Sequence, residues 1–286
     1  MSDAGASRLV VSADRALAER IRTLAAGRMV FVAGIPGTGK SLLAHQLAHV
    51  ASDAGRQVHL LQWDVARPVF EASPAGRRYP LTDGVTHAVI RRAAGLWVRD
   101  ALADWGELHH APEHFLVGET PFVGNRFVEL ARRIDDRAEA LLASPVCRFA
   151  IAAPSRDVRR FLEAQRERRA ANPLHPRERE DAPPHVLRDL WQSLAAVAGE
   201  TTGAPAPYDP AVYARVYERV LRHRNSEIVS LDVILPTERL SVYDFAVAPR
   251  DLVPSAADAE RFIREVEQRY PDPRVHDREL ERWLEV

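Results

Sequence analysis

The sequence predicts an α/β protein in which a mostly parallel β-sheet is sandwiched between helices. The 286-residue chain is 46% apolar and 28% charged, which is ordinary composition for a globular protein. Short apolar runs, typical of buried parallel strands, alternate along the chain with longer segments of helical periodicity. The first of these runs leads into a glycine-rich loop that is followed by a helical segment. We therefore expect one domain, residues 1–286, with insertions.

The expected strands and helices follow the alternation of a doubly wound fold. The first strand is Met29–Ala33, an entirely apolar run. A helix over 41–52 comes next, because Leu43, Leu47 and Val50 recur at helical spacing. Further strands are expected at 57–63, 114–117, 147–152 and 228–235. Further helices are expected at 86–105, 124–142, 156–169, 184–198, 210–222, 255–270 and 277–284.

Two proline-containing stretches interrupt this alternation. Residues 201–208 predict a linker or exposed loop. Residues 171–184 contain four prolines among charged residues and predict a long irregular loop, a kind of segment that is usually functional or mobile. With the arginine-rich helix before it, this loop forms a predicted lid over 156–184, and residues 249–286 form a predicted C-terminal helical extension.

Charge and cysteine content indicate the class of protein and its compartment. The net charge is −1, and acids are interleaved with arginines, so no long-range field marks the chain as a nucleic-acid or membrane binder. No apolar stretch approaches the length that spans a membrane, and residues 1–19 lack the apolar core of a signal peptide. Cys147, the one cysteine, cannot form an internal disulfide. These features predict a cytoplasmic protein.

The glycine-rich loop, residues 34–41, reads GIPGTGKS and matches the phosphate-binding pattern G-x-x-x-x-G-K-[ST]. Its glycines let backbone N–H groups turn toward phosphate oxygens, and the following helix adds the positive end of its dipole. Lys40 is expected to reach the β- and γ-phosphates, and Ser41 to ligate Mg²⁺. The expected nucleotide-binding residues are Gly34, Pro36, Gly37, Thr38, Gly39, Lys40, Ser41 and Leu42.

Lys40 stands out in the composition as well. Of the 39 basic residues it is the single lysine, and the other 38 are arginines. A chain that uses arginine wherever either cation would serve evidently requires a compact ammonium on a flexible stem at this position. We therefore expect Lys40 to be catalytic.

Asp64 directly follows the second predicted strand. The carboxyl ends of parallel strands open onto one crevice, so Asp64 is expected to face the γ-phosphate and to accept the proton of an acceptor hydroxyl. Arg67, about one helical turn on, could grip an anionic group of that acceptor. The alternative is a helix N-cap aspartate beside a surface arginine.

Glu119 follows the third predicted strand, where an acid can hold Mg²⁺ directly or through water. The alternative is an ordinary loop acid. We expect Glu119 to contribute to the metal site with Ser41, and Thr120 or Asn125 to help bind the acceptor.

An arginine-dense stretch opens the predicted lid: Arg156, Arg159, Arg160, Arg166, Arg168 and Arg169. One or two guanidiniums from a closing lid would neutralise charge on a transferring phosphoryl group, and Arg159 and Arg166 are the preferred candidates. Glutamates interleave with these arginines, so most of them are expected to form a solvated, salt-bridged face.

Together, the glycine-rich loop, the Asp64-x-x-Arg67 spacing, the acid Glu119 and the arginine-rich segment resemble P-loop kinases. Within these, the spacing is similar to that of the polynucleotide kinase, zeta toxin and phosphoseryl-tRNA kinase group. The resemblance covers residues 29–169 and implies a P-loop NTPase fold that uses ATP and Mg²⁺. It also implies that Asp64 activates the acceptor hydroxyl and that Arg67 holds an acceptor phosphate.

Three functions can be weighed on these residues. The favoured one is an ATP-dependent phosphotransferase acting on a hydroxyl of a small metabolite or nucleotide-like acceptor; nucleic acid is not favoured as the acceptor, because the charge is modest. The first alternative is a partner-regulated ATPase or nucleotide-switched regulatory protein, and the second is a binding protein without turnover. A GTPase is disfavoured, since its Asn-Lys-x-Asp motif needs a lysine beyond Lys40.

Overall fold

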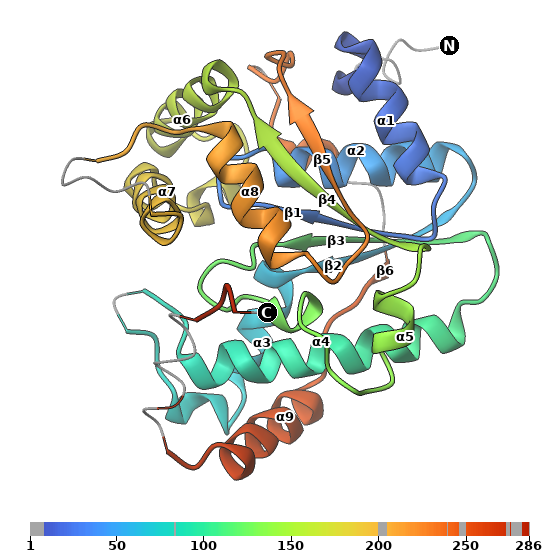
Figure 1. Ribbon diagram of the computed structural model, residues 1–286, viewed down its shortest axis with the longest axis vertical. Coiled ribbons are helices and arrows are strands. Elements are labelled where there is room, and N and C mark those ends of the chain that lie inside the picture. The colour runs from blue at the N-terminus through green and yellow to red at the C-terminus, as the bar shows by residue number, and fades with distance from the viewer. Residues whose placement is uncertain are drawn as a thin grey trace.

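The computed structural model describes residues 9–82, 84–199, 205–238, 240–245, 250–272, 275 and 282–285. Its centre is a six-stranded sheet in the order β5-β4-β1-β3-β2-β6, in which every described pairing is parallel. Helices flank both faces of this sheet (Figure 1). The strands are β1 Met29–Ala33, β2 Gln57–Gln62, β3 His114–Thr120, β4 Cys147–Pro154, β5 Ser226–Leu231 and β6 Arg250–Asp251.

The helices fill the connections between these strands. The α-helices are α1 Arg15–Ala25, α2 Lys40–Asp53, α3 Trp63–Ala72, α4 Ala88–Leu108, α5 Glu139–Leu142, α6 Arg156–Ala171, α7 Pro184–Val197, α8 Pro210–Val220 and α9 Ala256–Arg269. Short 3-10 turns are η2 Val10–Ala13, η3 Gly76–Arg78, η4 Val128–Leu130, η5 Pro176–Glu180 and η6 Val242–Phe245. Among the described residues, no helix combines the length and the apolar character needed to cross a membrane.

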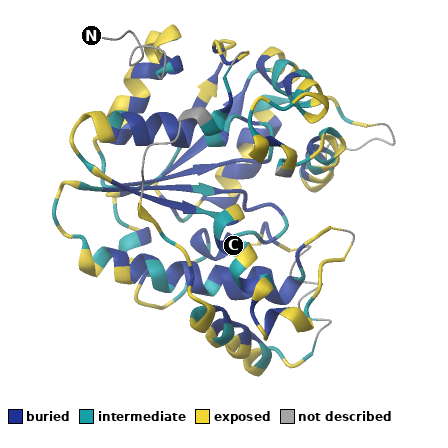
Figure 2. Ribbon diagram, turned by 180° about the vertical axis from the view of Figure 1, so that it is seen from behind, coloured by how far each residue is buried: buried dark blue, intermediate teal, exposed yellow. Residues whose placement is uncertain are grey.

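The central strand β1 is buried on both faces, and its alternate side chains serve two separate cores. Val30 and Val32 belong to the core that includes residues of α1 and α2, whereas Phe31 belongs to the core that includes residues of α3, α4, α8 and α9. The Phe31 ring needs the space left by Gly118, its partner in register on β3, because an added Cβ there would lie 2.2 Å from Phe31 Cδ1. Figure 2 shows the strands as a largely buried layer between the helices.

The chain leaves β1 and β3 toward opposite faces of the sheet. After β1 it enters α2, which packs with α1 on one face, and after β3 it enters a segment whose Phe122, Phe127 and Leu130 belong to the other core. Because β1 and β3 are adjacent and parallel, the two connections diverge at their carboxyl ends, which is the usual ligand position in open α/β sheets. Helices α6 and α7 lie together beyond the end of β4 (Figure 1).

The helix predicted over 124–142 is wrong. Apart from η4 and α5 this segment is an ordered loop, and Asn125 and Phe127 have positive φ angles that a right-handed helix does not allow. Its apolar side chains recur at spacings that resemble a helix but enter the core from a loop. Two buried arginines replace the helical hydrogen bonds. Arg99 donates to the carbonyls of Glu129 (2.7 Å) and Arg132 (3.1 Å), and Arg224 donates to that of Leu130 (2.6 Å).

The other strands and helices expected up to residue 270 agree with the structure apart from shifts at their ends. The third strand continues to Thr120, so Glu119 belongs to β3 and does not follow it. The fifth strand runs from Ser226 to Leu231 and not over 228–235. The loop expected over 171–184 contains the turn η5. The sequence did not predict α1, α3 or β6. Of the expected linker, 201–204 lies outside the described residues, as does 277–281 of the last expected helix, whose 282–284 form a turn.

Candidate functional site

The glycine-rich loop connects β1 to α2 and requires glycine for two reasons. Gly37 and Gly39 have φ angles of 76° and 85°, the left-handed region that L side chains rarely adopt. In addition, a Cβ on Gly37 would lie 2.5 Å from Leu187 Cδ2 of α7. The loop is braced from within, since the Thr38 hydroxyl donates to the Ile35 carbonyl at 2.8 Å.

The amino terminus of α2 is free of side-chain capping, because its N-cap residue is Gly39. The first N–H groups of a helix have no partner within the helix, and they lie at the positive end of its dipole. Such an end binds phosphate or carboxylate groups without any further device. The loop and helix therefore place unpartnered N–H groups and a positive dipole end at the carboxyl end of β1.

Glu119 accepts hydrogen bonds from Lys40 and Ser41 of this loop. Lys40 Nζ lies 3.3 Å from Glu119 Oε1, and the Ser41 hydroxyl donates to the same oxygen at 2.9 Å. Gln62 Nε2 donates to the other oxygen at 3.4 Å. Burial alone would raise the pKa of Glu119, but Lys40 and the Ser41 hydroxyl outweigh it, and the pKa is lowered. Glu119 is therefore a carboxylate at neutral pH.

Asp64 lies at the second position of α3, and the N-cap of that helix is Gln62. The alternative in which Asp64 caps the helix is therefore wrong. Desolvation by the surrounding protein atoms raises the pKa of Asp64, and the negative charge of Glu119 raises it further. The positive charges of Lys40, Arg67 and Arg126 oppose this shift but do not cancel it. A carboxylate with a raised pKa is a better proton acceptor than an ordinary aspartate.

Arg67 forms an ion pair with a neighbouring acid on the same helix. Its Nη1 lies 3.0 Å from Glu71 Oε2, one helical turn along α3, and Glu71 also accepts from the Thr86 hydroxyl at 2.9 Å. The guanidinium nevertheless remains close enough to Asp64 to lower its pKa. Arg67 thus lies beside the candidate base, held in place by an acid.

The loop after β3 carries a second arginine toward Asp64, and sequence reasoning missed it. Arg126 lies close enough to stabilise the Asp64 carboxylate, and burial lowers the pKa of Arg126 itself. Arg91 fixes the loop by donating to the Gly124 carbonyl at 2.6 Å. The neighbouring Asn125 is 2% exposed, and its Oδ1 has no hydrogen-bond partner. An arginine seven residues beyond a candidate metal-binding acid was the available signal.

The two preferred lid arginines have different positions. Arg159 is buried at 1% exposure and reaches the glycine-rich loop, where it donates to the Pro36 carbonyl at 3.0 Å. It also donates to the Leu187 carbonyl at 3.1 Å and pairs with Glu163 at 2.7 Å. Arg166 forms an ion pair with Asp181 instead. The structure therefore brings Arg159 to the loop and gives no such contact to Arg166.

His45 is a further residue that sequence reasoning missed. It lies on α2 one turn after Ser41, is buried, and its Nδ1 has no hydrogen-bond partner. Burial lowers the pKa of His45 although the charge of Glu119 opposes this. A helical spacing of four residues from Ser41 was the signal that could have found it.

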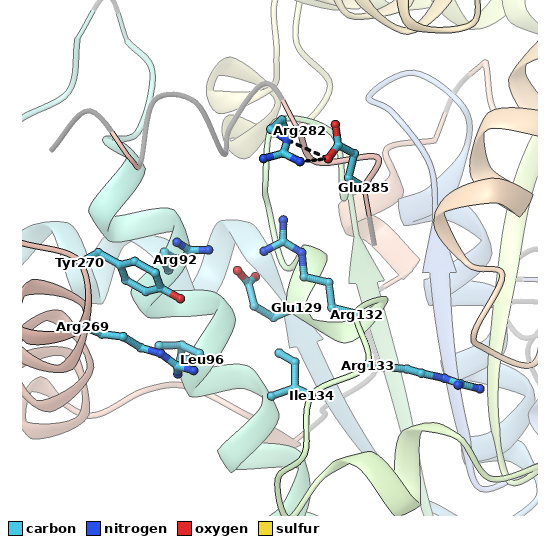
Figure 3. A pocket seen from close by; sticks show the side chains of 10 residues that line it. All are labelled: Arg92, Leu96, Glu129, Arg132, Arg133, Ile134, Arg269, Tyr270, Arg282 and Glu285. Carbon is cyan, nitrogen blue, oxygen red and sulfur yellow. Dashed lines mark hydrogen bonds and ion pairs between the residues drawn. The ribbon is translucent and has the colours of Figure 1, made fainter. Parts of the chain in front are cut away.

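A cavity of about 410 Å³ lies elsewhere, between α4, α9 and the loop after β3. Figure 3 shows the Glu129 carboxylate among the arginines that line this cavity. Glu129 is 2% exposed, neither of its oxygens has a hydrogen-bond partner, and burial raises its pKa. No residue of the glycine-rich loop lines this cavity.

Comparisons with known proteins do not identify a relative: no family model, curated protein or solved structure matches the chain.

Proposed function

We propose that the protein is an ATP-dependent phosphotransferase with a P-loop NTPase fold, which moves the γ-phosphate of Mg-ATP to a hydroxyl group of a small metabolite or nucleotide-like acceptor. One observation carries this proposal. Lys40 and Ser41 after β1 contact Glu119 at the end of β3, and the charges of Lys40 and Glu119 both act on Asp64 after β2, so all four lie at the carboxyl ends of adjacent parallel strands.

The residues present fit ATP and Mg²⁺. Uncapped N–H groups at the start of α2 and the ammonium of Lys40 supply donors for phosphate oxygens. The Ser41 hydroxyl and the Glu119 carboxylate are hard oxygen ligands of the kind that Mg²⁺ prefers, and they already contact each other at 2.9 Å. Bound Mg-ATP would supply the phosphoryl group and neutralise part of its charge.

Asp64 is the proposed general base. Its raised pKa suits it to take the proton of an acceptor hydroxyl, while Glu119, with a lowered pKa, remains charged. The two carboxylates thereby take different roles because only Glu119 forms an ion pair with Lys40. Arg67 and Arg126, which both act on Asp64, would hold an anionic part of the acceptor.

Arg159 takes a supporting role in this proposal. Its guanidinium is engaged by the Pro36 and Leu187 carbonyls and by Glu163. These contacts tie α6 and α7 to the glycine-rich loop, so Arg159 positions the loop. The sequence-based prediction that Arg159 stabilises the transferring phosphoryl group directly is not needed.

The test supplies γ-labelled ATP and Mg²⁺ together with a metabolite extract and RNA. Wild type is compared with Lys40→Ala, Asp64→Asn and the matched control Asp53→Asn, an exposed aspartate at the end of α2. Label in an organic acceptor that is lost in the first two variants and kept in the control supports the proposal. Label that appears only in inorganic phosphate would favour the partner-regulated ATPase, and absence of nucleotide binding would exclude both.

A further inference from the structure

Three histidines meet on the amino-terminal half of the sheet, away from the glycine-rich loop. His59 lies in β2, His114 is the first residue of β3, and His109 follows the last residue of α4. His59 Nε2 lies 3.1 Å from His114 Nδ1. The ring centroid of His109 lies 4.5 Å from the ring centroid of His59 and 4.5 Å from that of His114. One ring nitrogen from each residue lies within 4.8 Å of the others.

We propose that this histidine cluster, His59, His109 and His114, is a binding site for a divalent transition metal such as Zn²⁺. Zinc binds imidazole nitrogen at about 2.0–2.1 Å in tetrahedral geometry, which separates two ligand nitrogens by roughly 3.3 Å. The 3.1 Å pair already has this spacing. The widest pair would close by at most about 1.5 Å, a change that side-chain rotation can supply. Three ligands leave one tetrahedral position for water.

Neighbouring groups hold the rings of His109 and His59 in place. His109 Nδ1 lies 3.1 Å from the Trp105 carbonyl, to which its N–H can donate, and this leaves Nε2 with a lone pair directed elsewhere. The Trp105 ring stacks on His109 with centroids 5.5 Å apart and meets His59 edge-on at 5.6 Å. His59 is 3% exposed, so its ring is held among these neighbours with little access to solvent.

The ligand atoms decide which metal class fits. The cluster has no carboxylate ligand, so hard cations such as Mg²⁺ or Ca²⁺ gain little there. A borderline-soft ion that bonds well to imidazole is required. Bound metal would join the end of α4 to β2 and β3 and stabilise that edge of the fold.

The test titrates Co²⁺ into full-length protein that has been stripped with a chelator, and follows the visible absorption of tetrahedral Co²⁺. Wild type should bind one equivalent. His109→Ala and His114→Ala should weaken binding by at least about 100-fold, since each removes one of three ligands. His110→Ala, a matched control at the exposed adjacent histidine, should bind as wild type does. Glu119→Gln should also bind normally, because the two sites are separate.

The proposal is overturned if wild type shows no tetrahedral Co²⁺ spectrum, or if binding survives in both histidine variants. Should those variants fail to fold, X-ray absorption of the Zn²⁺-loaded wild-type protein replaces them. Three imidazole ligands per zinc would support the site, and fewer would overturn it.

Discussion

The ammonium of Lys40 lies 3.3 Å from Glu119 Oε1, and this joins the single lysine of the chain to an acid at the end of the neighbouring strand. The pair is buried on the lysine side, with 6% of the Lys40 side chain exposed. It keeps Glu119 ionised and leaves the nearby Asp64 with the raised pKa.

Lys40→Arg should abolish ATP binding and turnover although it keeps the positive charge. A planar guanidinium is larger than an ammonium and cannot occupy the same buried position beside Glu119 and Ser41. Calorimetric titration with Mg-ATP measures the effect. Arg160→Lys, at a side chain that is 78% exposed, is the control and should leave binding unchanged. Wild-type affinity in Lys40→Arg would contradict the requirement for lysine.

Arg126→Met should raise the pKa of Asp64 further. Arg126 is one of the groups that lower this pKa, so its removal shifts the proton equilibrium toward the protonated acid. The acidic limb of the rate profile should therefore move to higher pH, and the KM for an anionic acceptor should rise. Carboxyl ¹³C resonances, assigned with Asp64→Asn, give the same pKa without an activity assay. Arg77→Met, at an exposed arginine, is the control and should leave the pKa of Asp64 unchanged. An unchanged pKa of Asp64 in Arg126→Met would show that Arg126 does not act on Asp64.

Gly37→Ala should destabilise the protein more than Gly55→Ala. The two glycines have nearly equal φ angles, 76° and 78°, so both variants incur the left-handed penalty of about 1–2 kcal/mol. Only Gly37 adds a clash, because its Cβ would lie 2.5 Å from Leu187 Cδ2 whereas Gly55 has nothing within 4 Å. Chemical denaturation compares the free energies of unfolding. If the two variants lose equal free energy of unfolding, Leu187 of α7 can move away from the added Cβ at little cost, and the predicted clash is absent.

Glu129→Gln should remove a pH dependence of stability. Burial raises the folded-state pKa of Glu129 above its ordinary 4.5, so the folded state binds protons more tightly than the unfolded one. This contribution to stability is complete below pH 4.5 and is lost as pH rises through the folded-state pKa. Unfolding free energies between pH 5 and pH 8 should therefore fall less in Glu129→Gln than in wild type. Glu218→Gln, at an exposed glutamate, should follow wild type; equal slopes in all three proteins would show that Glu129 titrates normally.

Local pattern predicted most of the scaffold. The run Met29–Ala33 is buried on both faces of a parallel sheet and therefore reads as continuous apolar sequence. The glycines of the loop are required by local backbone geometry, so they too can be recognised from the sequence. The approach of Asp64 and Glu119 could be anticipated because parallel strands bring their carboxyl ends to one edge.

Long-range contacts decided the rest. The segment 124–142 has helix-like apolar spacing, yet Arg99 and Arg224, distant in sequence, bind its carbonyls and hold it as a loop. The choice between Arg159 and Arg166 depended on which one reaches Pro36 across the fold.

The sequence by itself determined the strand, loop and helix around Lys40, because these depend on residues that are neighbours along the chain. Only the tertiary structure decided which ionisable groups share a site. Ser41 meets Glu119 across 78 positions in the chain, and Lys40 contacts the same carboxylate, so the difference in pKa between Glu119 and Asp64 exists only after folding. The histidine cluster likewise forms only when β2, β3 and the end of α4 are packed together. The pairing of β2 with β3 brings His59 Nε2 to 3.1 Å from His114 Nδ1, which is 55 residues away in the chain.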